Sequence, residues 1–265
     1  IFSRTLNILS RFAFFKQPCC RYFLKKLNDC VVMKELSLFV LSDLHLSFGT
    51  DKPMDIFGGW QDYTRRIAEN WSSIVTDNDT VVLGGDLSWA TKLDDSKVDF
   101  EYIHSLPGQK IILKGNHDYW WSTVKKMSEF FEKNGFDDIK ILYNNAFEVG
   151  RIAVCGTRGW MFEDTQQDEK IKQREAGRFL RSAEEAVKTG LEPVAFLHYP
   201  PVFGDEISEN MLEVLHRFNI KRCYYGHLHG AASAQKALNG EFEGIKFRLT
   251  SCDTVGFCPV LVEKF

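Results

Sequence analysis

Five of the seven histidines in this chain follow short apolar segments, and most of them have an aspartate, an asparagine or a second histidine nearby. Apolar segments that end at glycine or at polar residues predict buried β-strands. In open α/β sheets, ligands bind at the carboxyl ends of the strands, so we expect these side chains to lie close together. The candidate donors at this edge are Asp43, His45, Asp86, Asn116, His117, His198, His227 and His229.

This set of donors indicates a particular kind of metal site. Imidazole nitrogens combined with carboxylate and amide oxygens suit Mn, Fe or Zn, and not a thiolate or calcium site. Two aspartates, four or five histidines and one asparagine exceed what one ion needs, so two ions that share a carboxylate fit better. Two ions about 3.5–4 Å apart serve phosphate-ester hydrolysis, and a residual site charge of about +1 attracts a phosphoryl group.

The segment 80–86 is predicted to be central to this arrangement. It reads as a buried strand that ends at Gly84 and Gly85 and then presents Asp86. Glycine lets a backbone turn sharply or approach a ligand closely. A Gly-Gly-Asp triplet alone is most often a turn, and a lone histidine after a strand is most often a core residue. Five such strand ends in one chain favour a site.

The expected elements alternate along the chain and indicate an α/β fold. Helices are expected at 60–75, 98–106, 122–133, 164–188 and 211–218. Strands are expected at 35–41, 80–83, 110–113, 193–197, 222–225, 245–250 and 260–263, with a meander at 139–143, 147–149 and 152–155. No repeat or internal linker interrupts the body, which favours a single domain over 33–265.

Charge and cysteine content narrow the function classes. Six basic residues and no acidic residue precede Asp29, whereas 27 basic and 36 acidic residues follow from there, so the body is acidic. An acidic body lacks the basic track that a nuclease needs. Seven irregularly spaced cysteines favour free thiols in a reducing compartment, from which we expect a cytoplasmic location. No apolar run approaches the ~20 residues that span a bilayer.

The basic, aromatic segment 1–32 differs in composition from the rest of the chain. A transit peptide or an interfacial anchor has this kind of composition. Untranslated sequence upstream of a start at Met33 is a further alternative. We expect a basic N-terminal extension that lies outside the fold.

The candidate donors occur in motifs that resemble those of the calcineurin-like metallophosphoesterase superfamily, in its predicted phosphohydrolase branch. The motifs are Asp43-x-His45, Gly85-Asp86, Gly115-Asn116-His117-Asp118, His198 and Gly226-His227-x-His229. They appear in the family's order across 43–229. The resemblance implies a four-layer sandwich of two stacked mixed β-sheets flanked by helices. It also implies a phosphoric ester hydrolase whose partner is a phosphorylated small molecule, with no clear binding of nucleic acid or membrane.

The resemblance assigns a role to each position. It implies one metal held by Asp43, His45 and His229, a second held by Asn116, His198 and His227, and Asp86 as the bridge. The cofactors would be two divalent ions, Mn first, with Fe or Zn as alternatives. The implied reaction is in-line attack by a hydroxide that bridges the ions, with His117 assisting the leaving group and Asp118 shaping the loop.

One position departs from the protein phosphatases of this superfamily. Those enzymes usually place a second aspartate three residues after the Gly-Asp motif, where it pairs with the catalytic histidine, but here that residue is Trp89. The change argues against a Ser/Thr protein phosphatase and leaves open what orients His117. Substrate contacts are expected from Arg158, whose guanidinium can bind a phosphate oxygen, and from the aromatic residues Trp120 and Tyr199.

Two alternative functions can be compared with this prediction. A nuclease or phosphodiesterase of the same superfamily would use the same ligands, although the acidic body counts against a nuclease. A non-catalytic scaffold would have lost ligands, and all seven ligand positions are filled here. A metal-dependent phosphoesterase is therefore the function that the sequence favours.

Overall fold

The computed structural model describes residues 35–160 and 166–265, and the architecture below belongs to the unit Glu35–Phe265. The predicted extension 1–32 lies outside the described residues. Strand β1 (Ser37–Leu41) is buried at every position, as expected for an apolar strand between two layers. It pairs with β13 (Val260–Lys264) on one side and with β2 (Thr80–Leu83) on the other.

The first sheet has five strands in the order β13-β1-β2-β3-β4, with β3 at Gln109–Ile112 and β4 at Ile139–Ile141. All neighbours run parallel except β13, which is antiparallel to β1. Because β1, β2 and β3 run in the same direction, the loops that follow them leave the sheet at the same edge.

The second sheet has six strands in the order β11-β12-β10-β7-β6-β5. Its four inner strands are parallel, and the two outer ones pair antiparallel. Their bounds are β5 Phe147–Val149, β6 Ile152–Thr157, β7 Glu192–Leu197, β10 Arg222–Tyr225, β11 Gly240–Phe242 and β12 Ile245–Leu249. A hairpin of β8 (Val202–Phe203) and β9 (Glu206–Ile207) is separate. Both sheets are mixed, as expected.

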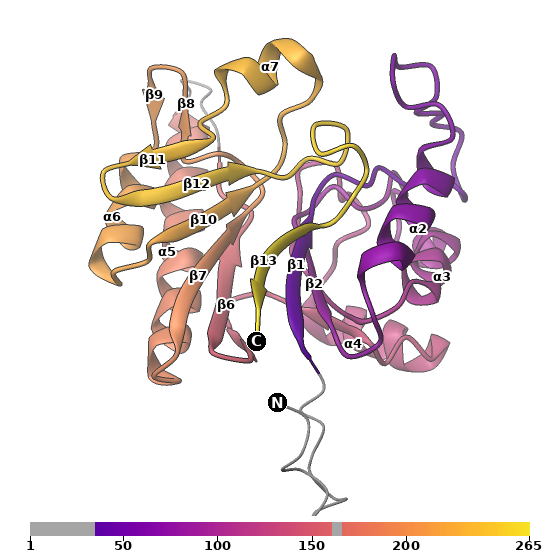
Figure 1. Cartoon of the computed structure of the whole chain (residues 1–265), viewed down its shortest axis with the longest axis horizontal. Helices are drawn as coiled ribbons and strands as arrows, with labels where there is room; N and C mark the ends of the chain where they lie inside the picture. The colour runs from indigo at the N-terminus through magenta and orange to yellow at the C-terminus, as the bar shows by residue number, and fades with distance from the viewer. Residues whose placement is uncertain (1–34, 161–165) are drawn as a thin grey trace, which may run out of the picture. The chain divides into compact units, whose positions relative to one another are not determined.

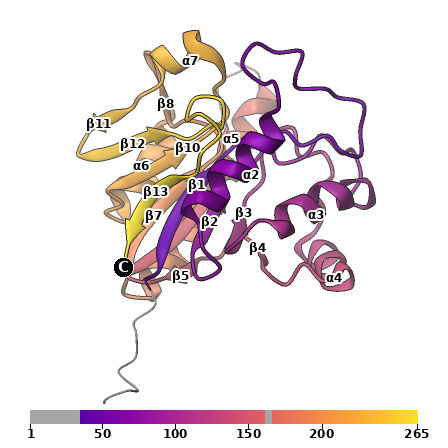
Figure 2. The ribbon, with the colours of Figure 1, turned by 45° about the vertical axis from the view of Figure 1, so that its right-hand side comes forward.

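Helices cover the outer faces of both sheets, which completes the four-layer sandwich (Figures 1 and 2). Beside the first sheet lie α2 (Tyr63–Ile74), α3 (Lys97–Ser105) and α4 (Val124–Asn134). Beside the second lie α5 (Gln166–Lys188) and α6 (Glu209–Arg217). The short helices are η1 (Asp94–Ser96) and α7 (Gly230–Lys236). The expected fold class is confirmed.

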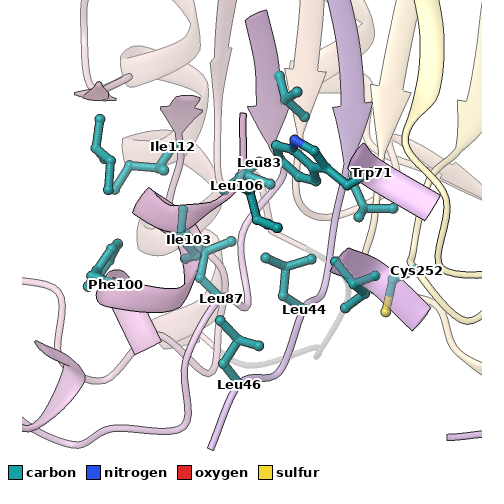
Figure 3. Close-up of a cluster of buried hydrophobic side chains, with 14 of the residues drawn as sticks. Leu44, Leu46, Trp71, Leu83, Leu87, Phe100, Ile103, Leu106, Ile112 and Cys252 are labelled. Carbon is teal, nitrogen blue, oxygen red and sulfur yellow. The ribbon is translucent and has the colours of Figure 1, made fainter. Parts of the chain in front are cut away.

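Three apolar clusters fill the spaces between these layers. Figure 3 shows the first, where Trp71 of α2 and Phe100 of α3 lie with Leu83 of β2 on the outer side of the first sheet. A second cluster packs α5 and α6 on the other sheet, and a third joins the two sheets. The strand ends are thus anchored from both sides.

One local expectation was wrong, and another was confirmed. Strand β4 does not form a meander with β5 and β6, because it pairs with β3 in the first sheet, while β5 and β6 form a hairpin in the second. The long helix expected over this part of the chain is confirmed as α5, which runs through Gly177. The first two residues of the helix expected at 164–188 lie outside the described residues. Within the parts of the chain that the structure describes, no helix is long and apolar enough to cross a membrane.

Candidate metal centre

The predicted donors leave the two sheets at one edge. Asp43 and His45 follow β1, Asp86 follows β2, and Asn116 follows β3. His198 directly follows β7, while His227 and His229 follow β10. Parallel pairing of β1 with β2 and of β7 with β10 holds these strand ends side by side. The parallel pairing within each sheet and the packing of the two sheets on each other therefore bring the donors together.

The donors form two groups of three. Asp43, His45 and His229 have ligand atoms within 4.8 Å of one another, and so do Asp86, His198 and His227. In the first group, Nε2 of His45 lies 3.1 Å from Nε2 of His229. Each group has the size and chemistry of a partial coordination shell for Mn, Fe or Zn.

Asn116 adds an amide oxygen to the second group. Its Oδ1 lies 2.6 Å from Nε2 of His198 and 2.9 Å from Nδ1 of His227. The other ring nitrogen of His198, Nδ1, lies 3.0 Å from the carbonyl oxygen of Gly84, which can accept its proton. That contact leaves Nε2 of His198 as the nitrogen with a free lone pair, directed at the donor group.

Asp86, a member of the second group, also faces the first group. Its Oδ2 is 3.8 Å from Nε2 of His45 in one group and 3.4 Å from Nε2 of His198 in the other. Its other oxygen, Oδ1, accepts a hydrogen bond of 2.7 Å from the backbone N–H of His117. The carboxylate is thus fixed by its loop while one oxygen faces both groups.

Four of the donor residues have positive φ angles that L-residues rarely adopt. The values are 63° for Asp43, 46° for His45, 54° for Asp86 and 71° for His227. None of the four is glycine, so each carries a conformational cost that the surrounding packing must offset. Backbone strain of this kind is concentrated at functional sites, which agrees with a role for this edge of the sheets.

Gly85 makes the close approach of two loops possible. A Cβ at this position, where φ is 91°, would lie 2.6 Å from the backbone nitrogen of Gly115 and 2.9 Å from Nδ1 of His198. Both distances are too short for any side chain, and the positive φ disfavours one as well. The glycine therefore lets the loop after β2 touch the loop after β3.

Asp118 ties the same two loops together. Its buried carboxylate accepts hydrogen bonds from the backbone N–H groups of Gly115, Asp86 and Leu87, at 2.7, 2.9 and 2.8 Å. It also accepts a hydrogen bond of 3.0 Å from Nε1 of Trp120. This residue therefore has a loop-shaping geometry. Trp120 is only 2% exposed and packs in the core, so it supports the loop from beneath and does not line the site.

The charge of the site fits bound cations. Asp43 and Asp86 are fully buried, and among residues 35–160 and 166–265 only histidines lie within ion-pair distance of them. Burial acts to raise the pKa of Asp43, but its contacts with His229 outweigh burial and lower that pKa. A buried carboxylate without such a partner is costly. Accordingly, burial raises the pKa of Asp86 to about 7, although the charge of His198 acts in the opposite direction. Divalent ions would supply the missing positive charge.

The histidines differ in their readiness to bind a metal. Burial lowers the pKa of His45 and of His227 to about 3, so both rings are neutral at neutral pH and can offer a lone pair. Burial also acts to lower the pKa of His229, but its hydrogen bonds to Asp253 and Asp43 outweigh burial and raise that pKa to about 10. Without metal, His229 therefore carries a proton at neutral pH.

Asp253 is a candidate positioning residue that the sequence reasoning missed. Its Oδ1 lies 2.9 Å from Nδ1 of His229, and its Oδ2 accepts a hydrogen bond of 2.8 Å from the backbone N–H of Gly230. A carboxylate that holds the far nitrogen of a ligand histidine fixes the ring and its tautomer. The available signal was the position of Asp253, just after β12, at the same edge as the other donors.

Metal binding is expected to release at least about one proton per dinuclear centre at pH 7, because His229 must lose one and burial also raises the pKa of Asp86. Metal affinity should therefore rise with pH between about pH 6 and 9, since protons compete less well for both ligands. Calorimetric titration in buffers with different protonation enthalpies measures the release. An affinity that is independent of pH would contradict this assignment.

His117 is beside the donor groups but belongs to neither. Its ring centroid lies 4.5 Å from that of Trp89, which also stacks on His45 at 5.0 Å. The hydroxyl of Tyr119 lies 3.4 Å from Nδ1 of His117. No carboxylate of the described residues is hydrogen-bonded to this ring, so Trp89 and Tyr119 occupy its surroundings. Burial lowers the pKa of His117, and neighbouring His198 lowers it further.

The remaining predicted contacts lie at the rim of the site. The ring of Tyr199 is 9% exposed and lies 4.2 Å from the ring of His227. The backbone carbonyl of Arg158 accepts hydrogen bonds from the N–H groups of His198 and Tyr199, at 3.2 and 2.8 Å. The side chain of Arg158 extends toward α5, where its Nη2 lies 3.4 Å from Glu175. Arg158 is therefore adjacent to the donors through its backbone.

Comparison with solved structures relates this fold to several proteins of low sequence identity. The protein TT1561 of Thermus thermophilus is 9% identical, with coverage of 86% of this chain and 97% of that chain and a TM-score of 0.53. The calcineurin-like phosphoesterase YfkN from Bacillus subtilis is 12% identical, with 87% and 89% covered and a TM-score of 0.49. Phosphopantetheinyl hydrolase from Mycobacterium tuberculosis is 14% identical, with 82% and 89% covered and a TM-score of 0.47.

The sequence comparison is more specific. No curated protein matches the sequence. The sequence model of the family described as calcineurin-like phosphoesterase matches residues 36–231, which include all the donors of both groups. The chain therefore belongs to the calcineurin-like phosphoesterase family.

Proposed function

We propose that this chain is a metal-dependent phosphoesterase that acts on a small phosphorylated molecule at a dinuclear centre. In this proposal one ion is held by Asp43, His45 and His229, and the other by Asn116, His198 and His227. Asp86 is the ligand of both ions. Imidazole, carboxylate and amide donors suit Mn²⁺, Fe and Zn. We take Mn²⁺ as the first metal to test, with Fe and Zn as alternatives.

One observation carries the proposal. A single carboxylate oxygen, Oδ2 of Asp86, lies 3.8 Å from a ring nitrogen of one donor group and 3.4 Å from a ring nitrogen of the other. A buried carboxylate in this position suits two cations better than one. Two divalent ions bound there would lower the pKa of a water molecule and stabilise the negative charge on the phosphoryl group.

The protein's own residues supply the rest of the chemistry. His117 is held beside the centre because its backbone N–H donates to Asp86 and its ring packs on Trp89. When the ring of His117 is doubly protonated, its Nδ1–H can donate to the hydroxyl oxygen of Tyr119, which leaves the Nε2 proton available. The cationic ring can then transfer the Nε2 proton to the leaving-group oxygen as the ester bond breaks, and it becomes neutral imidazole. Tyr199, whose ring lies beside that of His227, would contact the substrate on the side of the second donor group.

A phosphatase assay with added metal tests the proposal. The full chain with Mn²⁺ should hydrolyse p-nitrophenyl phosphate, and a chelator should abolish this turnover. Faster turnover of bis-p-nitrophenyl phosphate would instead favour the phosphodiesterase alternative. The absence of metal-dependent turnover on both compounds and on a broad panel of phosphate esters would favour a non-catalytic scaffold and overturn the proposal.

A further inference from the structure

A second group of charged residues lies at the same edge of the sheets but takes no part in the metal centre. Lys114 follows β3, Asn144 follows β4 and Arg158 follows β6, while Glu175 and Arg178 come from α5. These residues line one narrow pocket, with room for about one water-sized atom. The pocket therefore contains three cationic side chains and one carboxylate, an excess of two positive charges.

The carboxylate of the pocket is already fully engaged. Glu175 is 1% exposed, and its Oε2 accepts a hydrogen bond of 2.8 Å from the hydroxyl of Thr157. Its Oε1 accepts from Arg178 and lies 3.4 Å from Nη2 of Arg158. One carboxylate with these three donors has little capacity left for another cation.

One buried donor of the pocket is left without an acceptor. Nε of Arg158 is buried and makes no hydrogen bond, and the half-buried Lys114 lines the same pocket. Oδ1 of Asn144 is also buried without a partner, and rotation of this amide would present its nitrogen instead. A buried donor without an acceptor is costly, whereas an anionic oxygen would accept from Nε of Arg158 and attract the charge of Lys114.

The pocket adjoins the metal centre through the backbone. Lys114 is two residues before Asn116, and the carbonyl of Arg158 accepts a hydrogen bond from the N–H of His198. Two of the three cations are therefore fixed to the loops that carry Asn116 and His198. The loops that carry Asn116 and His198 therefore connect the pocket to the metal centre.

We propose that Lys114 and Arg158 bind an anionic oxygen of a second acidic group on the substrate, at the end remote from the ester that is hydrolysed. This inference rests on the proposed function and narrows it. The substrate class is a small phosphomonoester that also carries a carboxylate or a further phosphate. Arg178 and Glu175 hold Arg158 in place and do not contact the substrate.

A substrate series tests the pocket by kinetics. Alkyl phosphates of two to four carbons are compared, with a methyl, a carboxylate or a second phosphate at the far end. For at least one length, an acidic end should raise kcat/KM about tenfold over the methyl end, mainly through KM. Comparison of kcat/KM for the carboxylate-ended and phosphate-ended substrates shows which acidic group the pocket prefers. A ratio near one at every length would overturn the inference.

The variant Lys114→Gln should lower the ratio of kcat/KM for the acidic-ended substrate to kcat/KM for the methyl-ended one about tenfold. The substitution removes one charge from the pocket without leaving a buried carboxylate unpaired. The matched control is Lys126→Gln, the same substitution at an exposed position on α4, which should leave the ratio unchanged. A Lys114→Gln enzyme that retains the full ratio would also overturn the inference.

A binding measurement separates this inference from the proposed function. The full chain with Zn²⁺ is titrated with inorganic phosphate while the NMR signal of the Arg158 Nε–H is followed, assigned by its loss in Arg158→Lys. Phosphate should shift the signal, and Lys114→Gln should weaken that response about tenfold. A shift without turnover of any ester would support the pocket and contradict only the phosphoesterase. Turnover without any shift would overturn the pocket alone.

Discussion

Replacing Asp86 with asparagine is expected to reduce phosphoesterase activity by about a thousandfold or more and to remove bound metal. Asparagine has almost the same shape as aspartate, but it lacks the charge that both donor groups share. The distances of 3.8 and 3.4 Å from Oδ2 to the nearest nitrogen of each group make this oxygen common to the two. Metal analysis should fall from two ions per chain to one or fewer.

The unfolding temperature of metal-free Asp86→Asn shows whether the variant has lost only the metal site or also its fold. Burial raises the folded-state pKa of Asp86 from 3.8 to about 7, so its ionisation opposes folding increasingly as pH rises through that interval. At pH 8, metal-free Asp86→Asn should therefore unfold at a temperature no lower than the metal-free parent. Asp77→Asn, at an exposed position, is the matched control and should keep both metal and activity. A variant with two bound ions and normal turnover would refute the shared-carboxylate assignment.

Substitution of His117 by glutamine should produce a loss that depends on the leaving group. For an alkyl phosphate, whose leaving oxygen must be protonated, kcat should fall by about 10²–10⁴-fold. For p-nitrophenyl phosphate the fall should be far smaller, because nitrophenolate leaves without a proton. The measurement is a plot of log kcat against leaving-group pKa, which should be steeper for the variant than for the parent.

Two comparisons make this result specific. Metal content should remain at two ions per chain, because His117 belongs to neither donor group. His216→Gln, an exposed histidine that pairs with Glu243 on the surface, should leave the slope unchanged. An equal loss across all leaving groups would mean that His117 acts by another route, such as substrate binding. Tyr119→Phe should steepen the slope slightly if its hydroxyl orients the ring.

The strand ends of the donor residues could be predicted from sequence because the signal is local. An apolar β-branched run followed by Gly-Gly-Asp specifies a buried strand and its exit, whatever the rest of the chain does. Parallel pairing then brings Asp43, Asp86 and Asn116 to one edge without further information. The fold class and the family follow from the same local patterns.

The features that the sequence did not reveal depend on contacts between distant segments. Strand β4 resembles its successors in composition, and only its pairing with β3 places it in the first sheet. Asp253 became a candidate only when His229 was found 2.9 Å away. The absence of a phosphatase aspartate at Trp89 was visible in the sequence. The packing of the Trp89 indole against both His45 and His117 could not be predicted, because ring stacking has no local sequence pattern.

The hydrogen bond between Asp253 and His229 shows that the candidate site uses residues beyond the segment matched by the family model. The match to the family covers residues 36–231, yet Asp253 and strand β13 lie beyond it. Strand β13 pairs with β1, whose end presents Asp43 and His45. A polypeptide cut at the family boundary would lose the carboxylate that contacts His229 and the strand that pairs with β1. A fragment that keeps the whole candidate site must therefore include β13. The residues matched by the family model alone are too few for such a fragment.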